Sequence, residues 1–220
     1  MASIYFHFPF CRQACHYCNF HFSTQLKHQD EMLQAFEKEI ELRVEQWPGA
    51  LESIYFGGGS PSLLSPASVE KLISVVTKNF KLWDNIEITI EVNPDDVSFE
   101  YLEALSSIGI NRLSIGIQSF LDSELKLMNR IHNAVQGIKT IEWTAQLFDN
   151  FSVDLIYGTP SNDLSNWKKN LNQALSFDVP HLSSYALTVE PQTVLAHQVK
   201  NKKIQLLEED LVKSQYDWMV

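Results

Sequence analysis

The stretch Ile4–Cys18, IYFHFPFCRQACHYC, joins an apolar segment to a compact group of thiols. Ile4–Phe8 predicts a β-strand, because apolar and aromatic side chains dominate it. The loop that follows carries a C-x3-C-x2-C motif that contains all three cysteines of the chain, Cys11, Cys15 and Cys18. An odd number of cysteines makes a poor disulfide framework. Clustered cysteines in a reducing compartment more often bind metal or do redox chemistry.

The spacing of the motif suits a [4Fe–4S] cluster, in which three thiolates hold three irons and leave the fourth iron open to a small ligand. Zinc is the competing interpretation. A structural zinc site normally uses four protein ligands in paired C-x2-C halves, and the sequence has no second half. His7, His16 or His21 would have to complete such a site. Chance clustering without a metal is the third interpretation. The motif favours iron–sulfur and indicates little about the reaction.

Outward from this stretch, short β-rich segments alternate with longer helical patterns. The predicted strands are Ile4–Phe8, Ser53–Phe56, Ile86–Val92, Arg112–Ile117, Ser152–Tyr157 and His181–Leu187. The predicted helices are Gln29–Gln46, Ser65–Asn79, Ser98–Ile108, Ala134–Phe148 and Leu164–Ser176. Strand-then-helix units imply parallel strands joined by right-handed crossovers. Two α/β architectures fit, an open doubly wound sheet and a partial barrel, and both gather ligands at the carboxyl ends of the strands.

The composition is that of a folded protein, with 45% hydrophobic and 20% charged residues. Its 17 Lys and Arg against 27 Asp and Glu give a net charge of −10, which argues against nucleic-acid binding through a basic surface. No apolar run reaches the about 18–20 residues of a membrane span. Residues 1–20 do not resemble a secretory signal, so we expect a cytoplasmic protein. We also expect a core domain over residues 1–205, followed over 206–220 by the start of a C-terminal helical region that is cut short.

Polar residues and glycines follow several predicted strands. Gly57–Ser60 would let backbone N–H groups approach a ligand closely, although a glycine run is also an ordinary turn. Glu91 ends the third strand, where a carboxylate suits hydroxyl or ammonium groups and ordinary strand alternation is the plainer explanation. Gln118 closes the fourth strand with an amide that both donates and accepts. Asp154 lies inside an apolar strand, where an acid needs a partner.

The order of these motifs resembles the radical S-adenosylmethionine (SAM) superfamily, and the Y-x-H-x-P-F-C lead-in to the cysteines narrows the resemblance. The chain is most similar to the branch of oxygen-independent coproporphyrinogen III oxidase and its haem chaperone relatives. This family implies a partial (β/α)6 TIM-type barrel of parallel strands, a [4Fe–4S] cluster on the three cysteines, and SAM on the open iron. The resemblance assigns further cofactor contacts to Tyr5, Tyr17, Gly58, Gly59, Ser60, Glu91, Gln118, Arg130, Asp154 and Ala186.

Some of these residues also have plainer explanations. Tyr17, expected beside the SAM adenine, would serve equally as a hydrophobic lid on the cluster. Arg130 is expected on the SAM carboxylate, because a guanidinium pairs with it through two hydrogen bonds, but many arginines are simply exposed charges. Ala186 matches a backbone contact to SAM. His7 lines the first strand, where core packing is the alternative.

Within the branch, Cys18-Asn19-Phe20 favours the haem chaperones, because the oxidases carry a further cysteine where Phe20 stands. The resemblance then implies that the protein binds haem and delivers it to acceptor proteins, with an electron donor as a further partner and peripheral membrane association through the acceptors. Oxidative decarboxylation of coproporphyrinogen III is the alternative, and a non-enzymatic zinc module is an alternative of another class. The haem-related His-Asn motif of the family lies past residue 220, and His132-Asn133 is not that motif. No catalytic residue is assigned.

Overall fold

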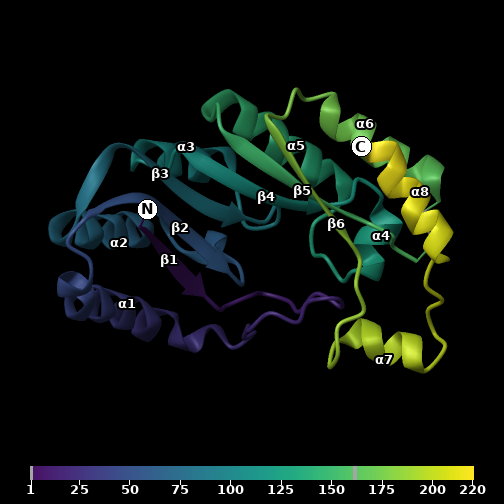
Figure 1. Ribbon diagram of the computed structural model, residues 1–220, viewed down its shortest axis with the longest axis horizontal. Helices are drawn as coiled ribbons and strands as arrows, with labels where there is room; N and C mark the ends of the chain where they lie inside the picture. The colour runs from purple at the N-terminus through teal and green to yellow at the C-terminus, as the bar shows by residue number, and fades with distance from the viewer. Residues whose placement is uncertain (1, 161–162) are drawn as a thin grey trace.

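The computed structural model describes residues 2–160 and 163–220, and within them six parallel strands form one sheet in the order of the chain (Figure 1). The strands are β1 (Ser3–Phe8), β2 (Ala50–Gly58), β3 (Lys81–Val92), β4 (Arg112–Gln118), β5 (Phe151–Tyr157) and β6 (His181–Ala186). A doubly wound sheet would reverse its strand order at a switch point, whereas a barrel adds strands in sequence. The sequential order confirms the partial (β/α)6 barrel.

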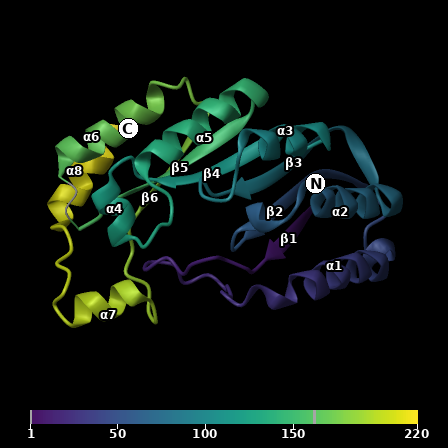
Figure 2. The ribbon, with the colours of Figure 1, turned by 180° about the vertical axis from the view of Figure 1, so that it is seen from behind.

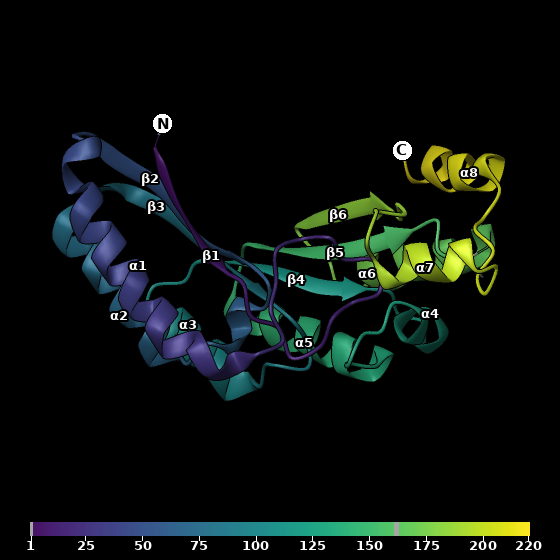
Figure 3. The ribbon, with the colours of Figure 1, turned by 90° about the horizontal axis from the view of Figure 1, so that it is seen from below.

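Helices connect successive strands across the described residues. They are α1 (Gln29–Arg43), α2 (Pro66–Asn79), α3 (Phe99–Ser107), α4 (Asp122–Leu127), α5 (Ala134–Leu147), α6 (Leu164–Leu175), α7 (Val194–Lys200) and α8 (Glu209–Met219). Short 3-10 turns cover Leu26–His28, Val44–Gln46 and Pro61–Leu63. Helices α1, α2, α3 and α5 lie on one side of the sheet, which leaves its other face uncovered there (Figure 3).

Helix α2 shows why these elements form where the sequence predicts them. The Ser65 hydroxyl accepts a hydrogen bond from the Ser68 N–H, and Pro66 occupies the first turn. The apolar residues of the helix recur along one face and are buried against the sheet; they are Val69, Leu72, Ile73 and Val76. The predicted start of this helix and its buried face are therefore confirmed.

Two helices and the first residues of two strands, β2 and β3, were not expected from the sequence. Helices α4 and α7 have six and seven residues, too few for a 3.6-residue period to stand out. Strand β3 begins at Lys81 rather than Ile86, because its polar first residues pair with the start of β2, Ala50 with Lys81 and Leu51 with Leu82. Pairing with a neighbouring strand has overridden a weak local pattern here.

The pleat of the sheet places apolar side chains on the face covered by helices and polar side chains on the opposite face. Side chains that face the helices are buried, among them Phe8, Phe56, Ile90 and Ile115. The alternate positions of neighbouring strands lie side by side on the other face; His7 is opposite Gly57, and Glu91 is opposite Ser114. The polar residues that end successive strands therefore gather on one face, at the carboxyl edge of the sheet.

Helix α8 lies alongside α6 (Figures 1 and 2). The Gln215 side chain accepts a hydrogen bond from the Gly158 N–H at 2.8 Å, and the Trp167 indole donates to the Gln215 carbonyl at 3.1 Å. Through these buried contacts, α8 closes one end of the core. In the described part of the chain, each helix is too short or too polar to traverse a membrane.

Candidate functional site

A cavity of about 540 Å³ opens at the carboxyl edge of the sheet. Its lining contains twelve of the thirteen residues that the sequence analysis assigned to cofactors: Cys11, Cys15, Tyr17, Cys18, Gly58, Gly59, Ser60, Glu91, Gln118, Arg130, Asp154 and Ala186. Tyr5 is the one outside the lining. It is 55% exposed, stacks on Tyr55, and places its hydroxyl 3.4 Å from His7 Nδ1. The fold therefore brings residues from the first strand loop to the last strand into one site.

The three cysteines lie on the loop between β1 and α1, and none is in a disulfide. The Cys11 N–H donates to the Ser23 carbonyl at 3.0 Å, which joins Cys11 to the far end of the same loop. Burial raises the pKa of the Cys11 thiol to about 11, and burial also raises the pKa of Cys18. Metal binding would release these protons, since thiolates are the ligands.

The donor set on this loop is chemically suited to a soft iron–sulfur centre, because three thiolates would each hold a different iron. Among the described residues, no three Cys, His, Asp or Glu side chains converge on one point as they would around a single metal ion. A [4Fe–4S] cluster does not require that convergence. Two of the three histidines suggested for zinc are engaged elsewhere: His7 Nε2 lies 3.1 Å from the His21 carbonyl, and His16 Nδ1 lies 2.9 Å from the Leu127 carbonyl.

The glycine loop differs from the expectation that its N–H groups would meet a ligand. Gly58 donates to Glu91 Oε2 at 3.1 Å, Gly59 to the Phe8 carbonyl at 2.8 Å, and Ser60 to the Phe10 carbonyl at 2.8 Å. The glycines are needed instead for close packing. A Cβ on Gly59 would lie 2.7 Å from the Phe10 carbonyl oxygen, and Gly58 has a φ of +114°. The loop thus presents Cα surfaces and the Ser60 hydroxyl to the cavity.

Two partly buried carboxylates line the cavity, and each accepts at least one hydrogen bond from the protein. Glu91 accepts hydrogen bonds from the Tyr55 hydroxyl at 2.9 Å and from the Gly58 N–H at 3.1 Å. Asp154 Oδ2 accepts from the Ser114 hydroxyl at 3.0 Å, and its buried Oδ1 has no hydrogen bond of normal geometry among the described residues. Burial raises the pKa of both acids. Hydrogen bonding from Ser114 on β4 and Ser183 on β6 opposes this rise in the pKa of Asp154.

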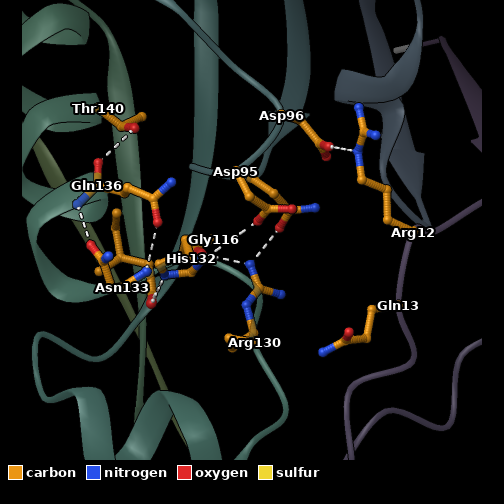
Figure 4. Close-up of polar contacts among 12 residues, drawn as sticks. Arg12, Gln13, Asp95, Asp96, Gly116, Arg130, His132, Asn133, Gln136 and Thr140 are labelled. Carbon is orange, nitrogen blue, oxygen red and sulfur yellow. Dashed lines mark hydrogen bonds and ion pairs between the residues drawn. The ribbon is translucent and has the colours of Figure 1, made fainter.

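Arg130 occupies the centre of the polar network in Figure 4, with Asp95 and His132 on one side and Arg12 and Gln13 across the cavity. Its Nη2 donates to Asn93 Oδ1 at 2.5 Å and to the Gly116 carbonyl at 2.9 Å, while Nη1 lies 3.5 Å from Cys15 Sγ. Only Nε is buried without a partner in the described residues. Arg130 is therefore not an exposed charge. Most of its donors are already used by the protein.

Several residues of this network were missing from the sequence analysis. Asp95 and Asp96 come after β3 and the Asn93-Pro94 pair, and two adjacent acids just beyond a buried strand were the available signal. The Arg12 guanidinium pairs with Asp96 at 2.6 Å on the cavity rim. Burial opposes ionisation of Asp95, but the adjacent His132 and Arg130 hold its pKa below the usual range. This wall of the cavity therefore carries an ionised carboxylate beside a guanidinium.

Gln118 lies at the end of β4 in an unusual conformation, with a φ of +67°. The turn after it is fixed by a buried polar group. Ser119 donates to Glu124 Oε2 at 2.5 Å, and the Asn170 side-chain carbonyl accepts from the Phe120 N–H at 2.7 Å. Left-handed backbone is uncommon for a residue other than glycine and persists where neighbours fix it.

Comparison with known proteins agrees with this geometry. The family model described as the radical SAM superfamily matches residues 5–174. The heme chaperone HemW of Bacillus subtilis is 35% identical over 99% of this chain, and that of Haemophilus influenzae is 37% identical over 89%. Coproporphyrinogen III oxidase (HemN) from Escherichia coli, a radical SAM enzyme, superposes with a TM-score of 0.88 at 28% identity over 99% of the chain. The chain therefore belongs to the radical SAM superfamily.

The relatives are longer than this chain. It spans 58% of the Bacillus subtilis HemW, 53% of the Haemophilus influenzae HemW and 51% of the HemN chain. A more distant structure, the methyltransferase TsrM from Kitasatospora setae with cobalamin and a [4Fe–4S] cluster bound, has a TM-score of 0.64 at 12% identity and shares the fold alone. Family membership implies a [4Fe–4S] cluster and SAM as cofactors.

Proposed function

We propose that this chain is the cofactor-binding core of a haem chaperone, which binds a [4Fe–4S] cluster, SAM and haem and delivers haem to acceptor proteins. One observation carries the proposal: the likeness to HemW extends over 99% of the chain at 35% identity. The loop agrees, because Phe20 stands where the oxidase branch carries a further cysteine. Residues 1–205 would form the core, and 206–220 would begin a helical region.

In this proposal Cys11, Cys15 and Cys18 hold the cluster. The cluster and SAM together supply a source of electrons and of a 5′-deoxyadenosyl radical. The protein's contribution is binding and exclusion of water. Glu91 and Gln118 would accept from or donate to SAM hydroxyl and amino groups, and Asp154 would accept through its carboxylate.

The other contacts follow from where the side chains lie. Tyr17 packs against the buried apolar side chains of Leu125, Met128 and Ile156. Its ring would cover the adenine of SAM. Arg130 would reach a SAM carboxylate through Nε. The remaining lining residues would shape the pocket through backbone and small side chains; they are Gly58, Gly59, Ser60 and Ala186. Tyr5 would act from outside the lining, through Tyr55, which donates to Glu91.

Oxidative decarboxylation of coproporphyrinogen III is the second candidate, and the TM-score of 0.88 to HemN favours it. The two functions are separated by paired assays on the reconstituted protein. A chaperone binds haem and leaves coproporphyrinogen III unchanged under anaerobic conditions with a reductant. An oxidase consumes coproporphyrinogen III. Failure of the full-length reconstituted protein to bind haem would reject the chaperone proposal.

The partners follow from the same proposal. Haem-acceptor proteins and an electron donor would bind near the cavity, and membrane contact would come through the acceptors. Three unpaired thiols suit a reducing compartment such as the cytoplasm.

A further inference from the structure

Two segments that are far apart in the chain are joined behind the cysteine loop. The Gln13 side chain donates to the Asn129 carbonyl at 2.9 Å, and the Asn129 side chain donates in return to the Ala14 carbonyl at 2.7 Å. Gln13 and Ala14 lie between two of the cysteines, and Asn129 lies just after α4. This reciprocal pair fixes the loop directly before Cys15.

The same two segments are also joined directly after Cys15. The His16 N–H donates to the Met128 carbonyl at 3.1 Å. His16 Nδ1 lies 2.9 Å from the Leu127 carbonyl, so this nitrogen carries the proton and donates. The His16 carbonyl accepts from the Leu195 N–H at 2.8 Å, at the start of α7. Cys15 is therefore bracketed by hydrogen bonds to a single turn, Leu127–Arg130.

That turn is itself rigid. The Asn129 N–H donates to the Lys126 carbonyl at 3.1 Å and the Arg130 N–H to the Leu125 carbonyl at 2.8 Å, which is the Schellman closure of a helix. The closure needs a left-handed residue, and Asn129 has a φ of +59°. Asparagine is one of the few residues other than glycine that adopts this conformation readily. The turn is anchored by Leu125 and Met128, each 1% exposed.

We infer that Asn129 and His16 are positioning residues that clamp the cysteine loop and thereby slow the loss of iron from it. This inference rests on the proposed cluster at the three cysteines. Both residues act on the backbone on either side of Cys15, so loosening either one frees the loop without removing a thiol. In the hydrogen bonds given above, neither the Asn129 side chain nor the His16 side chain contacts a cysteine.

The test measures how fast the reconstituted protein transfers iron to a chelator under anaerobic conditions. Asn129→Gly keeps the left-handed backbone and removes only the donor to Ala14. His16→Ala removes the donor to Leu127, and His16→Asn restores a donor near the position of Nδ1. We expect iron loss to be about five- to tenfold faster in Asn129→Gly and His16→Ala, the effect of one lost hydrogen bond. His16→Asn should return toward the wild-type rate.

Ser65→Ala is the matched control, because it also removes one side-chain hydrogen bond, at the start of α2 away from the cysteine loop. Its melting temperature should fall while its iron-loss rate stays at the wild-type value, which separates positioning from general stability. Gln13→Ala, which removes an exposed side-chain donor, serves if Asn129→Gly fails to fold. If the folded Asn129 and His16 variants lose iron at the wild-type rate, the positioning inference is wrong and the proposed function is unaffected. A wild-type protein that assembles no iron–sulfur cluster would overturn the proposed function and the inference with it.

Discussion

Replacing Arg130 by lysine should destabilise the protein and weaken SAM binding. Arg130 Nη2 holds two acceptors at once, Asn93 Oδ1 at 2.5 Å and the Gly116 carbonyl at 2.9 Å, and Nη1 reaches Cys15. A lysine ammonium is a single point donor on a flexible stem and cannot reproduce this fork. At least one buried acceptor would therefore lose its partner, at about 1–3 kcal/mol for each such group.

We expect the free energy of unfolding of Arg130→Lys to fall by about 2–3 kcal/mol, measured by urea denaturation of the protein without cofactors. SAM affinity, measured by calorimetry on the reconstituted protein, should fall by about tenfold or more, since the Nε–H that would meet SAM is also lost. Arg43→Lys is the matched control. It changes an exposed guanidinium on α1 that pairs with the exposed Glu39, so both quantities should change little.

The two measurements test the structural role and the SAM-binding role of Arg130 separately. Unchanged unfolding energy in Arg130→Lys would show that the three contacts of the guanidinium do not stabilise the fold. A lower unfolding energy with unchanged SAM affinity would leave Arg130 as a structural residue and remove it from the proposed SAM site.

Three further predictions address the iron–sulfur cluster, the buried Glu124 carboxyl and the glycine loop. Replacing any one of the three cavity cysteines by alanine should abolish a stable cluster, and a full iron and sulfide content in any variant would count against the assignment. Burial raises the pKa of Glu124, so its contribution to stability is fully present below the ordinary carboxyl pKa and is lost as the pH rises through the raised value. Glu124→Gln should therefore gain unfolding free energy relative to wild type between about pH 5 and pH 8 in urea titrations, whereas a constant difference would contradict this reasoning. Gly59→Ala should lower the free energy of unfolding by about 1–3 kcal/mol in the same assay, because the new Cβ would lie 2.7 Å from the Phe10 carbonyl oxygen. Gly137→Ala is the control, since its Cβ would lie 3.4 Å from Ile117. Equal effects of the two substitutions would reject the steric argument.

Most of the sheet could be predicted from the sequence, because β1, β2, β3 and β5 contain apolar runs and end at or next to a glycine, proline or asparagine. Ser152–Tyr157 was expected as a strand and lies within β5, which starts one residue earlier. The start of β3 could not be predicted, since Lys81–Asn85 is polar and becomes a strand only by pairing with β2. Helix α4 was missed for its length, although it carries the turn that holds the cysteine loop.

For the site, residue identity could be predicted better than residue role. Glu91 and Gln118 were found from their positions at strand ends and Asp154 as an acid inside an apolar strand, and all three line the cavity. The direction of hydrogen bonds could not be found in this way. The N–H groups of Gly58 and Gly59 were expected to face a ligand, but they donate within the protein, to Glu91 on β3 and to the Phe8 carbonyl on β1.

Anaerobic reconstitution with iron and sulfide, followed by titration with SAM and then with haem, tests the central claim most directly. The proposed function predicts iron and sulfide in equal amounts, a spectral change of the cluster when SAM is added, and stoichiometric binding of haem without consumption of coproporphyrinogen III. Zinc bound in place of iron and sulfide, or a reconstituted cluster protein that does not bind haem, would contradict it.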